Sequence, residues 1–189
     1  MNLFIDAVSV NWILILFDDN RKIIEKHVIN IKWNESSSLI PLVDIFLKNN
    51  NIDYKNLENI VVVNWPWSFT WIRTIVLGIN TINYIIKKNI TPISYFDLFN
   101  DYPIIKSSSK RDCFFKKSID NEVQIIENNK LIDLFDTSNT NIIYWEANKD
   151  IFTKIKILDK IDYSTIIKSV DFKNNDKIQP LYIKKPNIS

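Results

Sequence analysis

The chain has 189 residues, 46% of them hydrophobic, and its 24 basic and 22 acidic side chains give a formal net charge of +2. This length suffices for one sizeable domain or two small lobes, and the balanced charge neither favours nor opposes nucleic-acid binding. The single cysteine, Cys113, excludes an internal disulfide, and the single histidine, His27, excludes a paired-histidine metal site. No apolar run approaches the length of a membrane-spanning helix and no secretory signal opens the chain, so we expect a cytoplasmic protein.

The N-terminal third predicts three strands followed by an amphipathic helix. The strands are apolar, β-branched runs at residues 3–7, 12–17 and 22–31, with a turn between the last two. Apolar side chains then recur at helical spacing over residues 39–47. Pro41 is tolerated only in a first helical turn, which fixes the start of this helix.

The middle of the chain adds a strand, a long helix and a further strand. Residues 60–63 form a short, continuously apolar run, as expected of a buried central strand. A second long helix extends to residue 86 and is closed by Asn89, with Gly78 mid-helix, where another helix can approach closely. A strand at 90–93 and a short helix at 95–100 complete the order βββαβα.

Beyond residue 102 the pattern is weaker but still predicts secondary structure. The expected elements are a meander of strands at 104–107, 113–117 and 123–127, a strand at 142–144 and a helix at 163–170. The closest approach to a basic patch also lies here, and we expect it to be a solvated edge, with RNA phosphates as the alternative: Lys106, Lys110, Arg111, Lys116 and Lys117.

The segment after the buried strand carries an unusual set of residues, N-W-P-W-S-F-T-W-I-R, from Asn64 to Arg73. A strand-to-helix turn of this kind often needs positive φ, which glycine adopts freely and tryptophan almost never does. The whole chain has 1 Gly and 6 Trp, where ordinary composition would give roughly 13 glycines. A gene rich in A and T explains part of the glycine deficit but none of the tryptophan surplus.

With glycine at 65, 67 and 71 the segment resembles the signature G-P-G-S-F-T-G-[VIL]-R of the TsaB (YeaZ) family, the non-catalytic partner in bacterial threonylcarbamoyladenosine tRNA modification. Trp12 and Trp145 also align with family glycines, whereas Trp33 lies in a variable stretch. The P-L-Y-I-K-K-P of residues 180–186 resembles the family's C-terminal P-[LV]-Y-[LI]-R-x-P. Our hypothesis is that the gene reassigns a stop codon to glycine and was translated with tryptophan there. The alternative is a genuine tryptophan cluster in a core or on a sticky surface.

The resemblance implies an α/β, ribonuclease-H-like lobe of the actin-like ATPase type at residues 1–101, with a smaller, degenerate second lobe at 102–189. In active relatives an acidic residue on the first strand helps to hold a metal–nucleotide complex, and Asp6 occupies that place here. Because no second phosphate loop is recognisable, we expect Asp6 to be structural. The resemblance also implies a chain that is not an enzyme. The catalytic paralogue TsaD carries an H-x-x-x-H metal motif, which this chain cannot provide with its single histidine. We expect no cofactor, although a nucleotide at a complex interface is compatible with the family.

The resemblance further implies a scaffold that pairs with a TsaD-like subunit through its two long helices, joined by a TsaE-like ATPase, with tRNA bound indirectly and homodimers possible without the partner. The simpler interpretation of both apolar stripes is ordinary core. We expect Ser68 and Thr70 to cap the second helix and Arg73 to provide a structural or ligand-facing charge. The expected loop residues are Asp6, Trp65, Pro66, Trp67, Ser68, Thr70, Trp71 and Arg73. The expected interface residues are Leu39, Leu42, Val43, Phe46, Ile72, Ile75, Ile79 and Ile82.

Two segments depart from the family pattern and leave other functions open. Glu35-Ser36-Ser37 stands where relatives have H-S-E, and residues 108–115 keep only a basic residue and the apolar end of D-A-R-x-x-E-V-Y. One alternative is a small ATPase or kinase of the same superfamily that uses Asp6 and the 64–73 loop. Another takes every tryptophan literally and gives an aromatic module that stacks on bases or sugars.

Overall fold

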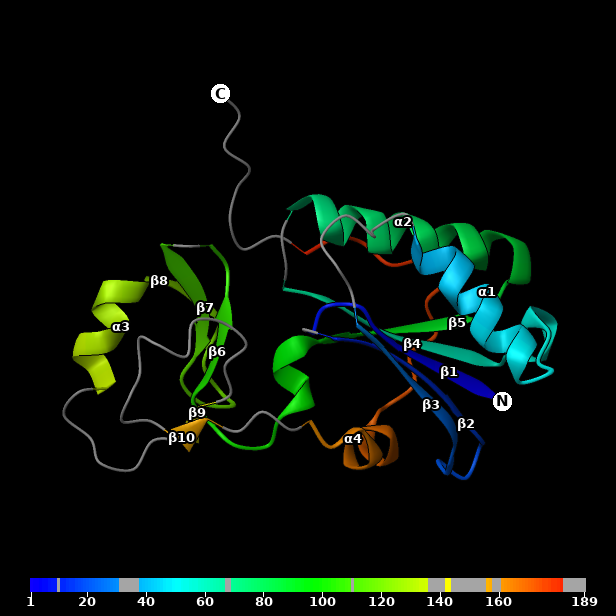
Figure 1. Ribbon diagram of the computed structural model, residues 1–189, viewed down its shortest axis with the longest axis horizontal. Helices are drawn as coiled ribbons and strands as arrows, with labels where there is room; N and C mark the ends of the chain where they lie inside the picture. The colour runs from blue at the N-terminus through cyan, green and yellow to red at the C-terminus, as the bar shows by residue number, and fades with distance from the viewer. Residues whose placement is uncertain are drawn as a thin grey trace. The chain divides into compact units, whose positions relative to one another are not determined.

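The computed structural model of the chain describes residues 1–9, 11–30, 38–66, 69–109, 111–135, 142–143, 156–157 and 161–181. It divides the chain into two compact units (Figure 1). Unit 1 comprises Met1–Tyr95 and Tyr163–Leu181, and Phe96–Asp162 belongs to unit 2. These units differ from the expected division into residues 1–101 and 102–189, because the first segment of unit 1 ends at Tyr95 and the last helix with the extended segment after it belongs to unit 1.

Unit 1 is built on a five-stranded mixed sheet in the order β3-β2-β1-β4-β5. The first three strands are antiparallel neighbours, whereas β4 is parallel to β1 and β5 is parallel to β4. Every residue of β1 is buried, and residues 60–63 of β4 are buried as the apolar run predicted for a central strand. The strands are β1 (Asn2–Asp6), β2 (Asn11–Phe17), β3 (Ile23–Asn30), β4 (Asn59–Trp65) and β5 (Asn89–Ser94).

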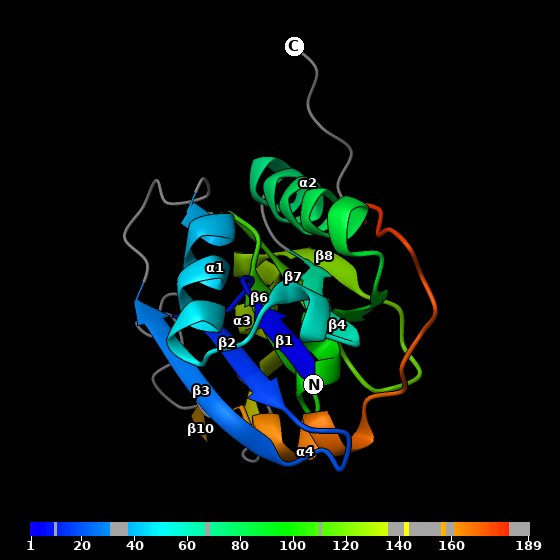
Figure 2. The same ribbon diagram turned by 90° about the vertical axis from the view of Figure 1, so that its right-hand side faces the viewer.

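Helices cover both faces of this sheet. The long helices α1 (Leu39–Asn49) and α2 (Phe69–Ile86) lie on one face, and α4 (Tyr163–Ser169) lies on the other (Figures 1 and 2). Gly78 faces α1, where a Cβ on it would lie 3.5 Å from the Ile40 Cγ1 atom. The expected close approach of two helices at this glycine is thus confirmed.

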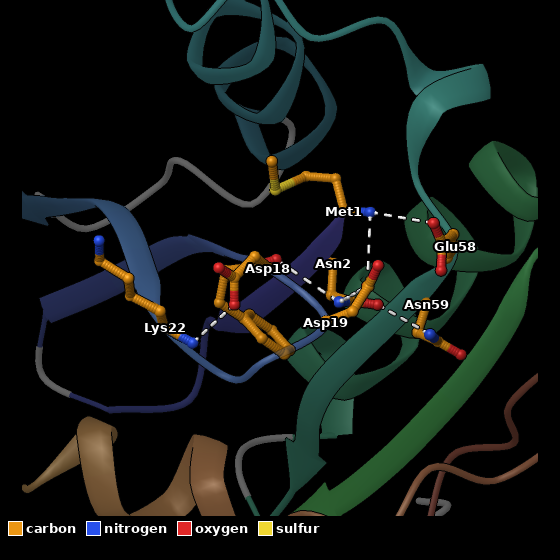
Figure 3. A network of polar contacts seen from close by, with 8 residues as sticks. Met1, Asn2, Asp18, Asp19, Lys22, Glu58 and Asn59 are labelled. Carbon is orange, nitrogen blue, oxygen red and sulfur yellow. Dashed lines mark hydrogen bonds and ion pairs between the residues drawn. The ribbon is translucent and has the colours of Figure 1, made fainter.

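A polar network fastens the start of β1 to its neighbours (Figure 3). The side chain of Asn2, fully buried, donates to Asp19 Oδ1 at 3.0 Å and accepts from Asn59 Nδ2 at 2.7 Å. The Met1 ammonium lies 3.3 Å from Glu58 Oε1 and 3.7 Å from Asp19 Oδ1. These contacts join β1, the β2–β3 turn and the start of β4, because a buried amide is stable only when its donors and acceptors are paired.

Unit 2 contains an antiparallel meander, β6 (Ile104–Ser107), β7 (Asp112–Lys116) and β8 (Gln124–Glu127), as the sequence predicted. Burial raises the pKa of the Cys113 thiol to about 12, so this thiol is an inert core group at neutral pH. Lys106 is fully buried and does not belong to a solvated edge. The expected basic patch is therefore interrupted, and Lys110 lies outside the described residues.

Several elements were missed or misplaced because their local pattern is weak. The sequence did not predict α3 (Asn128–Phe135), the short 3₁₀ helix η2 (Tyr54–Asn56) or β10 (Lys156–Ile157), which pairs with β9 (Ile142–Ile143). The short helix at 95–100 is a 3₁₀ turn, η3 (Tyr95–Leu98). The second helix ends at Ile86, and Asn89 begins β5 instead of closing the helix.

Candidate functional site

Asp6 lies at the carboxyl end of β1, the sheet edge where α/β proteins commonly bind ligands. Its side chain is fully buried. Oδ1 accepts hydrogen bonds from the backbone N–H groups of Val8 and Ser9, both at 3.0 Å. Oδ2 accepts from the Ser9 hydroxyl at 2.6 Å and from the Tyr163 hydroxyl at 2.7 Å. An ionised carboxylate has about four acceptor positions, so the chain itself occupies all of them.

The first three of these bonds are local and shape the turn between β1 and β2. A carboxylate that accepts from backbone N–H groups two and three residues later stabilises a tight turn without glycine. The spacing Asp6-x-x-Ser9 is the sequence signal for this arrangement. The expectation that Asp6 is structural agrees with these contacts.

The fourth bond comes from α4, which is 157 residues away along the chain. The Tyr163 ring packs edge-on against Phe4 with ring centroids 5.6 Å apart, and Lys26 Nζ lies 4.8 Å from the ring centroid on its outer side. The phenol is therefore held by an apolar contact, a cation–π contact and a charged acceptor together. No local pattern in the sequence indicated this partner for Asp6.

Two of the unusual tryptophans meet on the other side of the β1–β2 turn. Trp71 Nε1 donates to the carbonyl oxygen of Ala7 at 2.8 Å, and its ring contacts Trp12 edge-on at 5.4 Å between centroids. Trp12 is only 2% exposed, and Trp71 is half-buried. Both indoles thus pack against the turn that Asp6 organises.

The backbone at these tryptophans differs from our expectation. Positive φ at non-glycine residues of the described part occurs at Arg21, Asn51 and Lys87. Trp65 belongs to β4 and Trp71 to the first turn of α2. The argument that positions 65 and 71 need glycine for positive φ is therefore wrong for this backbone, because a strand and a helix supply ordinary φ values.

The remaining loop residues have mixed outcomes. Pro66 is buried, whereas Thr70 and Arg73 are exposed on α2. Since α2 begins at Phe69, Thr70 lies inside the helix, where its carbonyl oxygen accepts a bond from the Thr74 hydroxyl, so its expected capping role is wrong. Two further expected site residues lie outside the described residues: Trp67 and Ser68.

The two apolar stripes expected to meet a partner face the sheet instead. All of their residues except the half-buried Leu42 are buried in the core of unit 1: Leu39, Val43, Phe46, Ile72, Ile75, Ile79 and Ile82. The regular i, i+3, i+4 spacing marks the side of a helix that covers a sheet, which is the simpler interpretation given above. These residues do not form a surface in this chain.

A second set of apolar side chains points outward from the same two helices. We call it the outer helical face, and sequence periodicity missed it because its members fall between the buried positions. Groups of exposed apolar side chains mark interaction surfaces more often than single ones. Its members and exposed fractions are Ile40 (38%), Ile45 (53%), Leu77 (69%), Tyr84 (78%) and Ile85 (76%).

The other candidate groups offer little chemistry. The ring of His27 stacks on Phe46 at 6.1 Å between centroids. Among the described residues no group of three or more histidine, cysteine or acidic side chains is placed to share a metal ion. In the same part of the chain, no helix is long and apolar enough to cross a membrane.

The fold is that of known structures, although the sequence is distant from them. One similar structure is YeaZ from Pseudomonas aeruginosa, with a TM-score of 0.61 and 10% identity over 76% of this chain and 74% of that one. Another is described as an uncharacterized protein with similarity to peptidase YEAZ from Pseudomonas aeruginosa, with a TM-score of 0.70 and 10% identity over 97% of this chain and 99% of the other. No protein-family model and no curated protein matches the sequence. The likeness confirms the predicted α/β fold and shows that it is the fold of the YeaZ structure.

Proposed function

We propose that this chain is a TsaB-like, non-catalytic scaffold subunit of a tRNA threonylcarbamoyladenosine modification complex. The observation that carries the proposal is Asp6, whose acceptor positions are all filled by donors of the same chain within a YeaZ-type fold. A carboxylate engaged in this way stabilises a turn and leaves no lone pair directed at a metal–nucleotide complex. The resemblance of the 64–73 segment to the family signature supports the same assignment.

The outer helical face supports pairing with a TsaD-like catalytic subunit. It provides exposed aliphatic and aromatic groups on the two helices that the resemblance assigns to this contact. Aromatic side chains such as Tyr84 are enriched among the residues that carry binding energy at protein interfaces. In the proposed assembly a TsaE-like ATPase joins this pair, tRNA is reached through the complex in the cytoplasm, and the free chain forms homodimers.

The other functions have less support. An ATPase or kinase needs Asp6 free, and here its hydrogen bonds are internal. An aromatic binding module needs exposed indoles, whereas Trp12 is buried and the Trp71 N–H is used within the chain. A peptidase of the serine or cysteine type needs a histidine next to a nucleophile. Among the described residues no hydrogen bond joins His27 to a serine hydroxyl or a cysteine thiol.

The proposal is tested by binding to the TsaD-like protein of the same genome. Isothermal titration calorimetry should show a complex with the unaltered chain. The double variant Leu77→Lys/Tyr84→Ala should bind at least about 30-fold more weakly, the size expected when a central interface residue worth about 2 kcal/mol is removed. A reconstituted reaction should form threonylcarbamoyladenosine on tRNA only when the chain is present.

The matched control changes two exposed apolar side chains on β3, an edge strand of the sheet. Ile24 and Val28 on β3 are 50% and 49% exposed, and Ile24→Ser/Val28→Ser should leave the affinity unchanged. A complex weakened equally by both double variants would refute the outer helical face as the interface. Failure of the unaltered chain to bind would refute the scaffold assignment itself, and measurable ATP turnover by the isolated chain would favour the ATPase.

A further inference from the structure

Two lysines, Lys87 and Lys88, connect the end of α2 to the start of β5. We call them the lysine pair. Tyr84 and Ile85, two of the most exposed members of the outer helical face, lie in the last turn of α2 just before them. The lysine pair therefore lies at the margin of the surface that the proposed function assigns to a partner subunit.

The backbone of the lysine pair is fixed by Asn83, which is 2% exposed. The Asn83 side chain accepts from the backbone N–H of Lys88 and donates to the Lys88 carbonyl oxygen, both at 2.8 Å. The carbonyl oxygen of Asn83 accepts from the backbone N–H of Lys87 at 2.9 Å, and Lys87 has a φ of 55°, as residues that end a helix often have. All of these bonds use main-chain atoms of the lysine pair, so its position does not depend on the lysine side chains.

The two ammonium groups lack a carboxylate partner. Lys87 Nζ lies 4.8 Å from the centroid of the Tyr84 ring, and Lys88 Nζ donates to the carbonyl oxygen of Lys55 at 3.0 Å. In the part of the chain that the structure describes, neither ammonium forms an ion pair. The acidic side chain next to Lys55 is already paired, because Asp53 Oδ2 lies 3.4 Å from Lys55 Nζ. The positive charge of the lysine pair is therefore not neutralised by these neighbours.

The charged side chains of α1 and α2 add to this positive charge. On α1, Asp44 and Lys48 form an ion pair at 2.6 Å, so their charges cancel. On α2, the only charged residue is Arg73, whose side chain is exposed. With the lysine pair included, the two helices and their connection to β5 carry an excess of basic side chains. A surface with charge of one sign attracts a partner surface of the opposite sign.

Burial of Tyr84 against a partner would also remove water from Lys87, because the ammonium lies over the same ring. A cation that loses water without gaining an anionic neighbour is strongly unfavourable. We propose that the lysine pair binds carboxylates of the TsaD-like subunit and so sets the rate of docking at the outer helical face. This inference rests on the proposed function, and it names the chemistry that the partner must offer. The exposed Ile85 favours a protein over RNA, because a phosphate backbone does not cover an aliphatic side chain.

The rate of association with the TsaD-like protein, measured by stopped-flow fluorescence at low and at high salt, tests this inference. Lys87→Glu/Lys88→Glu should slow association at low salt at least about tenfold and remove most of its salt dependence, because opposite charges steer the encounter. The single variant Lys87→Glu should act in the same direction, and it keeps the bond from Lys88 to Lys55. The matched control Lys22→Glu/Lys168→Glu makes the same change in net charge on the β2–β3 turn and α4, and should alter the rate less than about twofold.

Equal association rates for the two double variants, with a complex still formed by the unaltered chain, would overturn the role of the lysine pair and leave the scaffold assignment intact. Failure of the unaltered chain to bind would refute the proposed function and this inference with it. A normal association rate combined with weaker tRNA binding by the assembled complex would overturn the carboxylate partner and make the lysine pair a phosphate site. Circular dichroism should show folded variants, since Asn83 bonds only main-chain atoms of the lysine pair.

Discussion

The carboxyl end of β1 and the outer helical face belong to the same unit but differ in how far their side chains are paired or buried within the chain. At the first, Asp6 is fully buried and each of its acceptor positions is filled by the chain. At the second, Leu77, Tyr84 and Ile85 are each more than two-thirds exposed, and most of their surface meets solvent. The polar atoms of Asp6 are thus already paired, whereas the outer helical face exposes apolar area that a partner could bury.

This difference teaches where to look for function in this fold. One fold can carry different activities or none, because activity depends on the contacts of specific residues. Here the contacts at the carboxyl end of β1 stabilise the fold. Free energy available for binding is larger at the outer helical face, where burial of apolar area has not yet occurred.

The largest expected effect follows from removing the Asp6 carboxylate at the carboxyl end of β1. Asp6→Ala should lower the free energy of unfolding by about 3–5 kcal/mol, because buried donors of the turn and of Tyr163 lose a charged acceptor. Urea denaturation measures the loss. The matched control is Asp44→Ala, since Asp44 makes an exposed ion pair with Lys48 at 2.6 Å that contributes only a few tenths of a kcal/mol. An Asp6 variant of normal stability that loses nucleotide binding would make this a ligand site instead.

The tryptophan pair gives the next largest effect. If tryptophan is the native residue at positions 12 and 71, Trp12→Gly should cost about 3 kcal/mol, because it removes a buried indole and its contact with Trp71. Thermal unfolding followed by circular dichroism measures this cost. A higher melting temperature for Trp12→Gly would show that the indoles are strained in place.

The glycine-recoding hypothesis makes a separate prediction about the native protein. Mass spectrometry of the tryptic peptide from Asn56 to Arg73, taken from the native organism, should show glycine at 65, 67 and 71. Glycine at all six tryptophan positions should then raise the melting temperature relative to the tryptophan chain. Tryptophan in the native peptide would refute recoding and make the Trp12–Trp71 contact a native feature of the β1–β2 turn.

The sequence predicted the parts of unit 1 that depend on local pattern. Continuous apolar runs identified β1, β2 and β4, because strands buried on both faces lack polar alternation. Helical spacing of apolar residues identified α1 and α2, because each of these helices buries one side against the sheet. The family signature located the β4–α2 connection, but Trp65 and Trp71 lie in a strand and a helix without positive φ, and residues 67 and 68 of the turn lie outside the described residues.

The same reasoning failed wherever the partner was distant or the pattern was incomplete. Along the sequence, Tyr163 and residues 171–181 are separated from their partners by residues 96–162 of unit 2, and no spacing rule connects residues so far apart. Periodicity also identifies the buried side of a helix and not its binding side. The expected interface residues, such as Val43 and Ile79, were therefore core, and the exposed Leu77 and Tyr84 were missed.

A smaller effect is expected at Gly78, where α2 approaches α1. Gly78→Ala should raise the free energy of unfolding by about 0.5–1 kcal/mol, because alanine restricts the unfolded chain and favours the helix. The added Cβ would meet Ile40 and Leu39 at 3.5 and 3.6 Å, which is ordinary van der Waals contact. Chemical denaturation measures the gain. A loss of stability would show that the helices pack more closely in solution than these distances indicate.

The smallest effect on stability is expected on the outer helical face. Leu77→Ser and Ile85→Ser should each change the free energy of unfolding by less than about 0.5 kcal/mol, because their side chains are already 69% and 76% exposed. The matched control on the same helix is Ile79→Ala, fully buried, which should cost about 2–5 kcal/mol. If the outer variants were as destabilising as the inner one, these side chains would be covered within the isolated chain. The contrast between the carboxyl end of β1 and the outer helical face would then disappear, since the groups of both regions would be paired or buried within the chain.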